Sequence, residues 1–596
     1  MSARAVILAG FAGLAFAGDA RAADDVASYP EPGSRYASAF TTVTFAGAGV
    51  GALDGLEVVG SESGAHPGKL RKLRDGRGTV FAPETPFKPG ERVLVRSGVR
   101  VLGGGRSFSF RTARFAAPHQ RRAAASRARA ADAPPCRLKK RRYRTLRGFR
   151  PPDLCTSVAR GSRLSPGRLM VTPRPGPNGQ WGAAIVSSGG KLLWYLPAAT
   201  TINDLKVVSF RGERLLALFH KPSERTSYYE LLNRRYQPVA RITAGNGYRV
   251  DSHELQLTTH GTIYLGSYSR VLVDRREVVD YVVQELDGAT GDVLFEWHAL
   301  DHVPLSASYK SSWFRVDNGW DYFHGNSIEP PQGTREILVS ARNTSSVYAI
   351  DRATGDVRWT LSGKRDDYGI VERHPRWQFC AQHDARRLPN GDITLFDNGS
   401  TFFRNGSGTC PDHPSRAMVF RLDEERRRAR VIRTFSSREA TGDSRGYWPY
   451  AVGSVRTQPD GNLLISWGTT GRVTEVTPEG DVNLRLAIGE RSNGGWSYRA
   501  VRDEWDGTPD GRPAIEARRR RDGRIDVWAS WNGATSIARW RVLAGDAEDA
   551  LDPAGEFGFT DLETGMRFRS TADFVAVQAL DAHGNVLGQS ATARAR

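Results

Sequence analysis

The chain has 596 residues, 39% of them hydrophobic and 10% aromatic, which suffices for a large buried core and for more than one domain. The formal net charge is +19, but residues 111–150 alone hold fourteen Lys or Arg and a single acid, Asp132. Such a run is typical of a solvated linker, so the charge argues against a folded nucleic-acid-binding face. Many glycines and prolines, together with short Val-, Ile- and aromatic-rich runs, favour an all-β protein.

The first 22 residues have the features of a signal peptide. Arg4 supplies the positive charge, residues 5–18 form a short apolar run, and Ala20-Arg21-Ala22 is an A-x-A cleavage site. The apolar run is too short to span a bilayer comfortably, and no cysteine follows the cleavage site. We therefore expect an extracytoplasmic protein, secreted or periplasmic, with no stable membrane anchor.

Residues 24–115 are predicted to form a small β-sandwich-like domain. The candidate strands, separated by turns such as Pro89-Gly90, cover residues 41–45, 56–59, 92–95 and 107–110. Residues 116–150 form the basic Ala/Arg-rich linker. Nothing in either segment indicates chemistry.

Residues 151–545 contain a loose repeat of two strand pairs, each pair meeting at a turn. The clearest unit runs from residue 347 through the turn at 351–355 to Trp359, and residues 283–297 repeat it. The predicted unit starts are Asp204, His253, Gly325, His383, Gly453 and Tyr498. Six four-stranded units, spaced by about 45–70 residues, predict a six-bladed β-propeller. Residues 169–196 precede these units and are expected to help close the ring, and residues 546–596 are predicted to form a C-terminal β appendage.

The four cysteines are informative in an exported protein, where disulfide bonds persist. The simplest pairing joins neighbours in the sequence, Cys136 with Cys155 and Cys380 with Cys410. Four cysteines allow three connectivities, so the other two stay open. Zinc ligation is the rival interpretation, but the sequence lacks the C-x-x-C spacing typical of such sites.

Five polar residues lie close to the starts and ends of predicted innermost strands. They are His253, His324, Asn326, Arg342 and His383. The starts of innermost strands meet at one mouth of a propeller channel, so we expect these side chains to converge although 130 residues separate the first from the last. The residue types suit nucleophilic attack, proton transfer and anion binding.

Short motifs around these residues resemble those of the bacterial arylsulfotransferases, which use no nucleotide sulfate donor. The matching stretches are Asp251-Ser252-His253, His324-x-Asn326-Ser327, Arg342, Gln382-His383-Asp384-Ala385 and Leu388-Pro389-Asn390-Gly391. The resemblance covers roughly residues 165–545 and implies a β-sandwich domain on a six-bladed propeller. It also implies that His383 is the nucleophile and that His253, His324, Asn326 and Arg342 complete the site.

The resemblance implies transfer of a sulfuryl group from a phenolic sulfate ester to a phenol in two steps, through a sulfohistidine. Arg342 would grip sulfuryl oxygens, Asn326 and His324 would donate hydrogen bonds to the same oxygens, and His253 would move the proton. No cofactor and no metal are expected. The substrates are small molecules, with no nucleic-acid partner. A homodimer stays open, because the basic linker and the terminal segments differ from the family.

Aromatic side chains near the motifs are candidates for the walls of an aryl-binding site, although such residues more often pack between sheets. They are Trp320, Tyr322, Phe323, Trp448 and Tyr450.

Two other classes of function remain open. Residues 351–355 with Trp359 resemble the tryptophan-docking repeat of quinoprotein dehydrogenases, but the motif is well formed only once, and six units are too few for the usual eight blades. A non-catalytic exported propeller that binds a ligand is the other alternative, because a fold does not fix a function.

Overall fold

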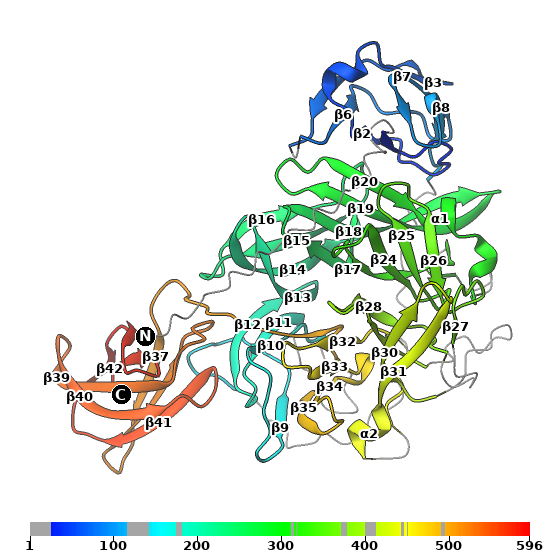
Figure 1. Ribbon diagram of the computed structural model, residues 1–596. Coiled ribbons are helices and arrows are strands. Elements are labelled where there is room, and N and C mark those ends of the chain that lie inside the picture. The colour runs from blue at the N-terminus through cyan, green and yellow to red at the C-terminus, as the bar shows by residue number, and fades with distance from the viewer. Residues whose placement is uncertain are drawn as a thin grey trace, which may run out of the picture.

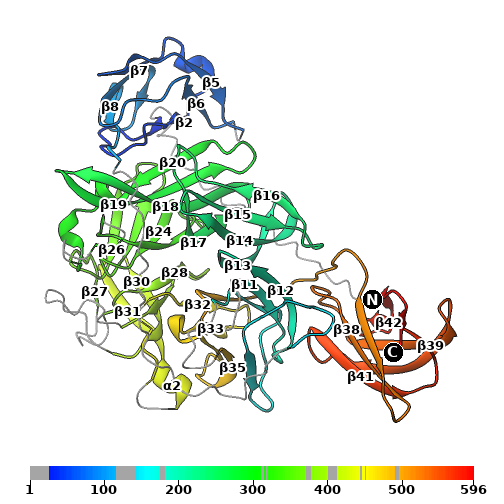
Figure 2. The ribbon, with the colours of Figure 1, turned by 180° about the vertical axis from the view of Figure 1, so that it is seen from behind.

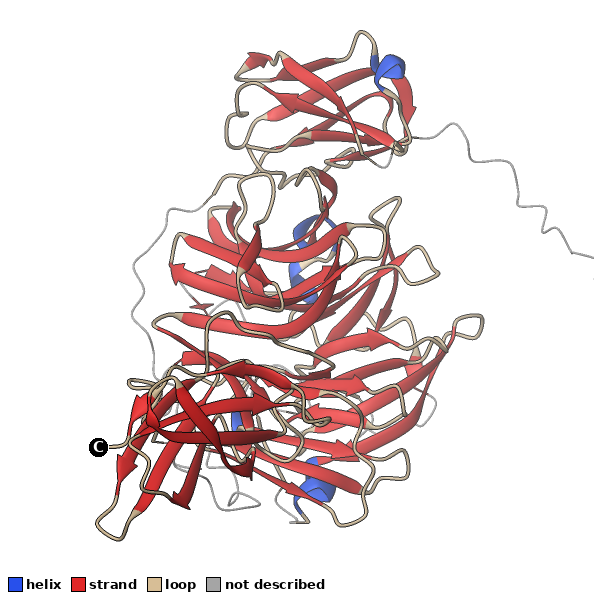
Figure 3. Ribbon diagram, turned by 90° about the vertical axis from the view of Figure 1, so that its left-hand side faces the viewer, coloured by secondary structure: helices blue, strands red, loops and turns tan. Residues whose placement is uncertain are grey.

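The computed structural model describes residues 26–74, 76–115, 142–174, 181–310, 315–316, 319–370, 378–399, 413–442, 446–449, 451–489 and 495–596. These residues form many small, mostly antiparallel sheets, so the predicted all-β class is confirmed (Figure 3). The helices of this part are α1 (Ala299–His302), α2 (Ser437–Thr441) and three 3-10 helices, Val50–Leu53, Leu305–Ala307 and Gly468–Thr470. Among the described residues, we find no helix with the length and apolar character needed to cross a membrane.

Two four-stranded sheets pack together at the N-terminal end, at the top of Figure 1. In sheet order the strands are β1 (Ala27–Tyr29), β2 (Val43–Ala46), β6 (Gly78–Pro83) and β5 (Gly68–Lys72), then β4 (Gly64–Ala65), β3 (Glu57–Gly60), β7 (Arg92–Val101) and β8 (Gly105–Arg111). Buried Phe45 and Phe81 of one sheet share a core with Val93 and Phe108 of the other. In β7, buried valines alternate with exposed arginines, as expected of a sheet with one face in water.

Residues 168–503 contain six further sheets, each built on four antiparallel strands. The first three, from innermost to outermost strand, are β36 (Ala500–Asp503), β10 (Arg168–Val171), β11 (Trp181–Val186), β12 (Leu192–Ala198); β13 (Thr201–Phe210), β14 (Glu213–Ser223), β15 (Thr226–Leu232), β16 (Pro238–Ile242); and β17 (Val250–Leu257), β18 (Thr262–Val273), β19 (Arg276–Asp287), β20 (Val293–His298). The short strands β21 (Arg315–Val316) and β22 (Gly319–Asp321) extend the third sheet through β19.

The next three sheets follow the same strand order. They are β23 (Gly325–Glu329), β24 (Glu336–Ala341), β25 (Ser346–Asp351), β26 (Val357–Leu361); β28 (His383–Arg387), β29 (Ile393–Asp397), β30 (Arg416–Asp423), β31 (Arg428–Ser436); and β32 (Ser454–Thr457), β33 (Leu463–Ser466), β34 (Arg472–Val476), β35 (Val482–Ile488). β27 (Gly369–Ile370) pairs with β31, and β9 (Leu154–Val158) pairs with β35.

The first strands of these sheets lie side by side in chain order. β13 contacts β17, which contacts β23, which contacts β28, which contacts β32, while β36 contacts both β13 and β33. Hydrophobic clusters join each sheet to the next, and one cluster joins the sixth sheet to the first. The starts of the first strands are therefore close together, which is the property that positions the site (Figures 1 and 2).

The unit predicted to start near Tyr498 differs from the prediction. Only β36 belongs to it, and β36 pairs with β10 from Arg168↔Asp503 to Val171↔Ala500, so segments more than 300 residues apart share one sheet. Residues 506–513 contain two glycines, two prolines and two aspartates, which favour a loop over a further strand.

The C-terminal strands also begin earlier than predicted. They are β37 (Ala514–Arg519), β38 (Arg524–Ser530) and β41 (Glu563–Arg569) in one sheet, and β40 (Ala550–Gly558), β39 (Arg539–Ala547), β42 (Phe574–Leu580), β43 (Val586–Gln589) and β44 (Ala593–Arg594) in the other. The predicted boundary after residue 545 falls inside β39, which pairs with β40 and β42. The alternating apolar residues of β37–β39 resemble those of the preceding repeat, so the sequence pattern did not mark this boundary.

Candidate functional site

Breaks in strand register lie at the positions predicted for the site. The register shifts between Val250 and Leu255 in β17, between Gly325 and Ser327 in β23, and between His383 and Arg386 in β28. A bulge of this kind bends the strand and re-aims a side chain. His253 and Asn326 lie within these shifts and His383 lies at the edge of one, so the three candidate residues share the same local irregularity in three sheets.

The backbone is also strained here. His324, Asp384 and Val452 have positive φ angles of 57°, 58° and 56°. This left-handed region of backbone dihedral angles is uncommon for residues other than glycine, and it is a true outlier for a β-branched residue such as Val452. Such conformations often cluster at functional sites, where the surrounding packing enforces them.

The predicted histidines converge around a tyrosine that the sequence did not single out. The ring centre of His253 lies 5.3 Å from that of His324 and 5.4 Å from that of Tyr498. The ring centre of Tyr498 lies 6.3 Å from that of His383. Tyr498 is buried and immediately precedes Arg499 and β36. Three imidazoles from three neighbouring segments thus border one small region.

Two of the histidines are backed by carboxylates. His253 Nδ1 lies 2.5 Å from Asp251 Oδ2, and His324 Nδ1 lies 2.5 Å from Asp321 Oδ2. Burial lowers the pKa of His324, whereas the neighbouring Asp321 carboxylate opposes this shift. Each acid orients its imidazole and stabilises the protonated form, which is the arrangement of a proton-transfer pair.

His383 has a different environment. Its side chain is buried, its Nδ1 lies 2.7 Å from the Oδ1 of Asn398, and its Nε2 accepts a hydrogen bond from the Val452 backbone N–H at 3.2 Å. Burial, with the positive charge of Arg342 as the next cause, holds the pKa of His383 well below its usual range. A neutral imidazole is the nucleophilic form, so the surroundings suit the predicted role.

Arg342 and Asn326 lie among these rings. Arg342 follows β24 and is 5% exposed, its backbone N–H donates to the His324 carbonyl oxygen at 2.9 Å, and its charge contributes to lowering the pKa values of both His324 and His383. Asn326 is buried, and its Nδ2 donates to the Gln382 carbonyl oxygen at 2.8 Å. One hydrogen of this amide is therefore engaged in joining β23 to the segment before β28.

A lysine that the sequence did not indicate adds positive charge. Lys310 is buried, and burial together with the charge of Arg342 lowers its pKa to about 7. Its carbonyl oxygen accepts a hydrogen bond from the Trp320 indole at 3.2 Å. Arg342 beside His324 and His383, with Lys310 interacting electrostatically with Arg342 and Asp321, makes the region suited to an anionic group such as a sulfuryl group.

The opening to solvent lies on the side of the carboxylate-backed histidines. The side chains of His324 and His253 are 24% and 16% exposed, whereas His383 is 1% exposed. A substrate would therefore meet the proton-transfer pairs first and His383 deeper inside.

Below the rings, the first strands carry a buried network of ion pairs. Its acids are Asp204, Glu254, Glu329 and Asp384, and its cations are Lys206, Arg386, Arg456 and Arg499. Four negative charges meet four positive ones, so the network as a whole is neutral. Glu254 directly follows His253 and Asp384 directly follows His383, so the network fixes the strands that carry both histidines.

One comparison with known proteins finds a family model that matches the segment carrying these residues. Residues 228–489 match the family model described as arylsulfotransferase (ASST). This segment contains all five predicted site residues. Residues 228–489 are therefore similar to the arylsulfotransferase family. The arylsulfotransferase resemblance inferred from the motifs is thereby confirmed, whereas the individual residue roles stay predictions.

Matches to solved structures are remote. A protein of unknown function from Bacteroides caccae is 14% identical, with 56% of this chain and 98% of that chain covered and a TM-score of 0.35. A catalytically inactive variant of virginiamycin B lyase from Staphylococcus aureus with quinupristin is 7% identical, with 64% and 96% covered and a TM-score of 0.29. No curated protein matches the chain.

The predicted aromatic walls of an aryl-binding site are only partly placed at the candidate site. Tyr322 and Phe323 are fully buried in the core between the third and fourth sheets, so they pack the fold and are not walls of an open site. Trp448 is 37% exposed, and Tyr450 lies outside the described residues. Tyr268 lies nearer the chemistry, because its ring centre is 5.5 Å from that of His324.

The cysteine pairing stays a prediction. Cys155 and Cys380 are buried and neither is a free thiol, but Cys136 and Cys410 lie outside the described residues. Cys380 lies three residues before His383, at the end of a segment whose backbone bonds to Asp397. For metal binding, the described part of the chain contains no group of three or more His, Cys, Asp or Glu side chains that could hold an ion.

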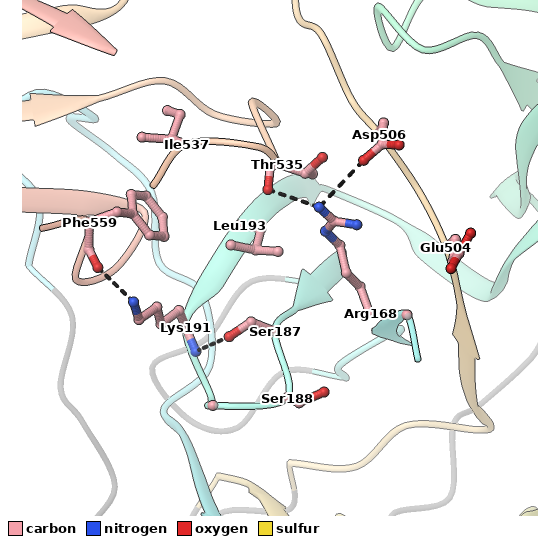
Figure 4. Close-up of a pocket in the computed structure, with 12 residues that line it drawn as sticks. Arg168, Ser187, Ser188, Lys191, Leu193, Glu504, Asp506, Thr535, Ile537 and Phe559 are labelled. Carbon is pink, nitrogen blue, oxygen red and sulfur yellow. Dashed lines mark hydrogen bonds and ion pairs between the residues drawn. The ribbon is translucent and has the colours of Figure 1, made fainter. Parts of the chain in front are cut away.

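A separate cavity of about 660 Å³ lies between the first of the six sheets and the C-terminal strands (Figure 4). It contains none of the predicted site residues. Arg168 donates to the Thr535 carbonyl oxygen at 3.0 Å, and Lys191 donates to the Phe559 carbonyl oxygen at 2.6 Å. Because these contacts tie the two units together, we assign the cavity to their interface and not to the chemistry.

Proposed function

We propose that this protein transfers a sulfuryl group from a phenolic sulfate ester to a phenol through a covalent intermediate on His383. One observation carries the proposal. Within the family-matched segment, a buried neutral imidazole, two carboxylate-backed imidazoles and a buried arginine border the same region. Nucleophile, proton-transfer groups and anion clamp are the parts that a two-step sulfuryl transfer requires.

In the first step, a ring nitrogen of His383 forms a bond to sulfur while the bond from sulfur to the phenolic oxygen breaks. The electron pair leaves with the phenoxide, which takes a proton from a protonated imidazole of His253 or His324. Arg342 faces the sulfuryl oxygens, and its charge cannot be lost by deprotonation. Lys310 adds to the positive charge that balances these oxygens.

In the second step, the acceptor phenol gives its proton to the same imidazole and its oxygen attacks sulfur. The nitrogen–sulfur bond breaks, and its electron pair returns to His383. One histidine thus serves as acid and then as base, which the carboxylates of Asp251 and Asp321 favour by stabilising the protonated ring. No proton is gained or lost over the full cycle.

The proposal also includes the architecture and the location of the protein. We assign the six sheets as the blades of a six-bladed propeller, supported by the contacts of their first strands and by the cluster that joins the sixth sheet to the first. Residues 1–22, which lie outside the described part, are proposed to direct export to the periplasm or the medium.

The first prediction concerns the acceptor. In an assay of the purified protein with a nitrophenyl sulfate, added phenol should accelerate release of nitrophenol, and phenyl sulfate should appear in equal amount. The reason is that phenol resolves the covalent intermediate. Equal release without phenol, with inorganic sulfate as the only product, would identify a sulfatase instead.

The second prediction concerns pH. Nitrophenoxide leaves without needing a proton, so the burst of nitrophenol from donor alone reports on His383. Because the pKa of folded His383 lies well below 6.5, we expect the burst rate to stay constant from pH 8 to 6.5 and to fall only at lower pH. Unfolded histidine binds a proton near pH 6.5 but folded His383 does not, so acid below that pH should also reduce stability. A burst rate that halves near pH 6.5 or above would contradict the assignment.

The alternative activities make different predictions. A quinoprotein dehydrogenase would show absorbance from a bound quinone and calcium-dependent dye reduction. A ligand-binding protein without catalysis would show neither a burst nor a transferred sulfuryl group. The family match favours the transferase over both.

A further inference from the structure

The three imidazoles of the site differ in the group behind them. The Nδ1 atoms of His253 and His324 face carboxylate oxygens, whereas the Nδ1 of His383 faces the amide oxygen of Asn398. A carboxylate stabilises the protonated ring, and an amide does so much less. The group that faces Nδ1 therefore distinguishes His253 and His324, which suit proton transfer, from His383.

The orientation of Asn398 follows from its own hydrogen bonds. Its Nδ2 donates to the Pro449 carbonyl oxygen at 3.1 Å and to the Val452 carbonyl oxygen at 3.0 Å. Both amide hydrogens are thus used, and a flipped amide would set its oxygen against two carbonyl oxygens. Only Oδ1 can face His383, and because an amide oxygen accepts but does not donate, the hydrogen lies on Nδ1 of the ring.

The other side of the ring agrees with this tautomer. The Val452 backbone N–H points at His383 Nε2 from 3.2 Å, and an N–H requires an acceptor there. The two contacts are independent, since one involves a side-chain amide and the other a backbone donor. Together they leave the ring lone pair on Nε2.

Asn398 is rigidly held. It is fully buried and directly follows β29, in which Phe396 pairs with His383. The Ser415 hydroxyl donates to the Asn398 carbonyl oxygen at 2.6 Å. The amide is therefore positioned by the same hairpin that carries His383.

The charged groups around His383 do not alter this assignment. Arg342, His253 and His324 all disfavour protonation of His383, and the Tyr498 ring stands at 83° to the His383 ring. The nearest carboxylate in sequence, Asp384, is bound by Arg386 and Arg456 in the ion-pair network. Among the described residues, no carboxylate is hydrogen-bonded to the His383 ring.

We propose that Asn398 is a positioning residue that fixes His383 as the Nδ1–H tautomer and so makes Nε2 the atom that receives the sulfuryl group. This inference rests on the proposed function for its chemistry. The Nε2–S bond forms as the S–O bond of the donor breaks, and Nδ1 keeps its hydrogen. The sulfated ring then stays cationic, which makes it a good leaving group when the acceptor oxygen attacks and the electron pair returns to Nε2.

The same geometry requires a small displacement. The Val452 N–H occupies the lone-pair direction of Nε2 and must move when sulfur approaches. Val452 holds a left-handed conformation that is strained for a β-branched residue, so this strain favours release of the peptide.

The tautomer is tested first by NMR of the full-length protein labelled with ¹⁵N-histidine, without any substrate. Two-bond correlations distinguish a protonated Nδ1 from a protonated Nε2, and the His383→Gln variant identifies the signals. We expect His383 to carry its hydrogen on Nδ1. A hydrogen on Nε2 would overturn the inference. This readout does not depend on activity, so it stands apart from the proposed transfer reaction.

The second test uses the donor-only burst with nitrophenyl sulfate. Asn398→Asp places a carboxylate behind His383. We expect the pH at which the burst rate falls on acidification to shift upward by at least about 1 pH unit. Asn398→Ala, which removes the acceptor without adding charge, should lower the burst rate about tenfold or more with little change of that pH. Asn483→Asp is the matched control, because Asn483 is buried in β35 and its Nδ2 donates to the Arg163 carbonyl oxygen, away from the three histidines.

The outcomes separate the two proposals. If the pH at which the burst rate falls shifts upward in Asn398→Asp but not in Asn483→Asp, the role of Asn398 is supported. If that pH is unchanged in Asn398→Asp, with the melting temperature close to that of the wild type, the role is overturned. If the wild-type protein transfers no sulfuryl group, the proposed function fails, and the NMR result alone decides the tautomer.

Discussion

Replacement of His383 by leucine is expected to lower sulfuryl transfer by at least about 10³-fold, because the group that attacks sulfur is lost. The fold should survive, since His383 is buried and leucine replaces the ring with an apolar side chain of similar bulk. The Asn398 amide oxygen and the Val452 N–H would lose their partner, so a modest loss of stability is expected. Initial rates with nitrophenyl sulfate and phenol, with circular dichroism as the folding control, measure both effects.

The covalent intermediate gives the direct readout of the same residue. A reaction with donor alone, quenched and digested under mildly alkaline conditions, should leave a sulfuryl mass on the peptide that contains His383. The His253→Gln and His324→Gln variants should slow turnover by about 10²-fold or more but still show the labelled peptide, because these rings move protons and do not hold the group. Label on a peptide without His383, or full activity in His383→Leu, would refute the assignment.

Much of the site could be predicted because its residues recur at the same place in a repeat. His253, Asn326 and His383 were located at strand starts, and the structure places all three at register shifts of first strands. Convergence followed from the architecture, since first strands meet whatever their distance in sequence. The motif resemblance then supplied the roles, which spacing alone does not give.

The supporting residues were harder to predict. Asp251 and Asp321 lie two and three residues before their histidines, so local spacing held a signal for both. Asn398 and Val452 lie 15 and 69 residues after His383, and only the pairing of β28 with β29 and the loop before β32 bring them to the ring. A hydrogen bond set by tertiary packing leaves no periodic trace in the sequence.

The ion-pair network shows how the fold serves the site. Its members come from the first strands of the second to sixth sheets, and Arg499 stands immediately before β36 of the first. Although burial disfavours its charged form, the surrounding cations hold the pKa of Glu254 below the usual range, so the acid stays charged. Removal of a single member leaves a buried partner uncompensated, which makes the network sensitive to point changes.

Arg499 contacts three acids of the network, and Arg499→Met is expected to destabilise the protein by about 3–5 kcal/mol. Its guanidinium lies 2.9 Å from Asp204, 3.2 Å from Glu254 and 3.3 Å from Asp384, and it donates to the Asn326 carbonyl oxygen at 3.1 Å. Methionine preserves much of the volume but leaves three acids with one cation fewer. Transfer activity should fall as well, because Arg499 binds the strands that carry His253, Asn326 and His383, and these strands would lose that shared contact.

The matched control is Arg421→Met. Arg421 binds Asp392 through two contacts of 2.8 Å, but its side chain is 59% exposed, so water replaces the lost partner. In urea unfolding followed by tryptophan fluorescence, the midpoint of Arg499→Met should fall well below that of the wild type, while that of Arg421→Met stays close to it. Arg499→Lys should recover part of the stability, because it restores the charge but not the geometry of three simultaneous contacts. Equal midpoints for Arg499→Met and Arg421→Met would show that the buried network does not hold the first strands together.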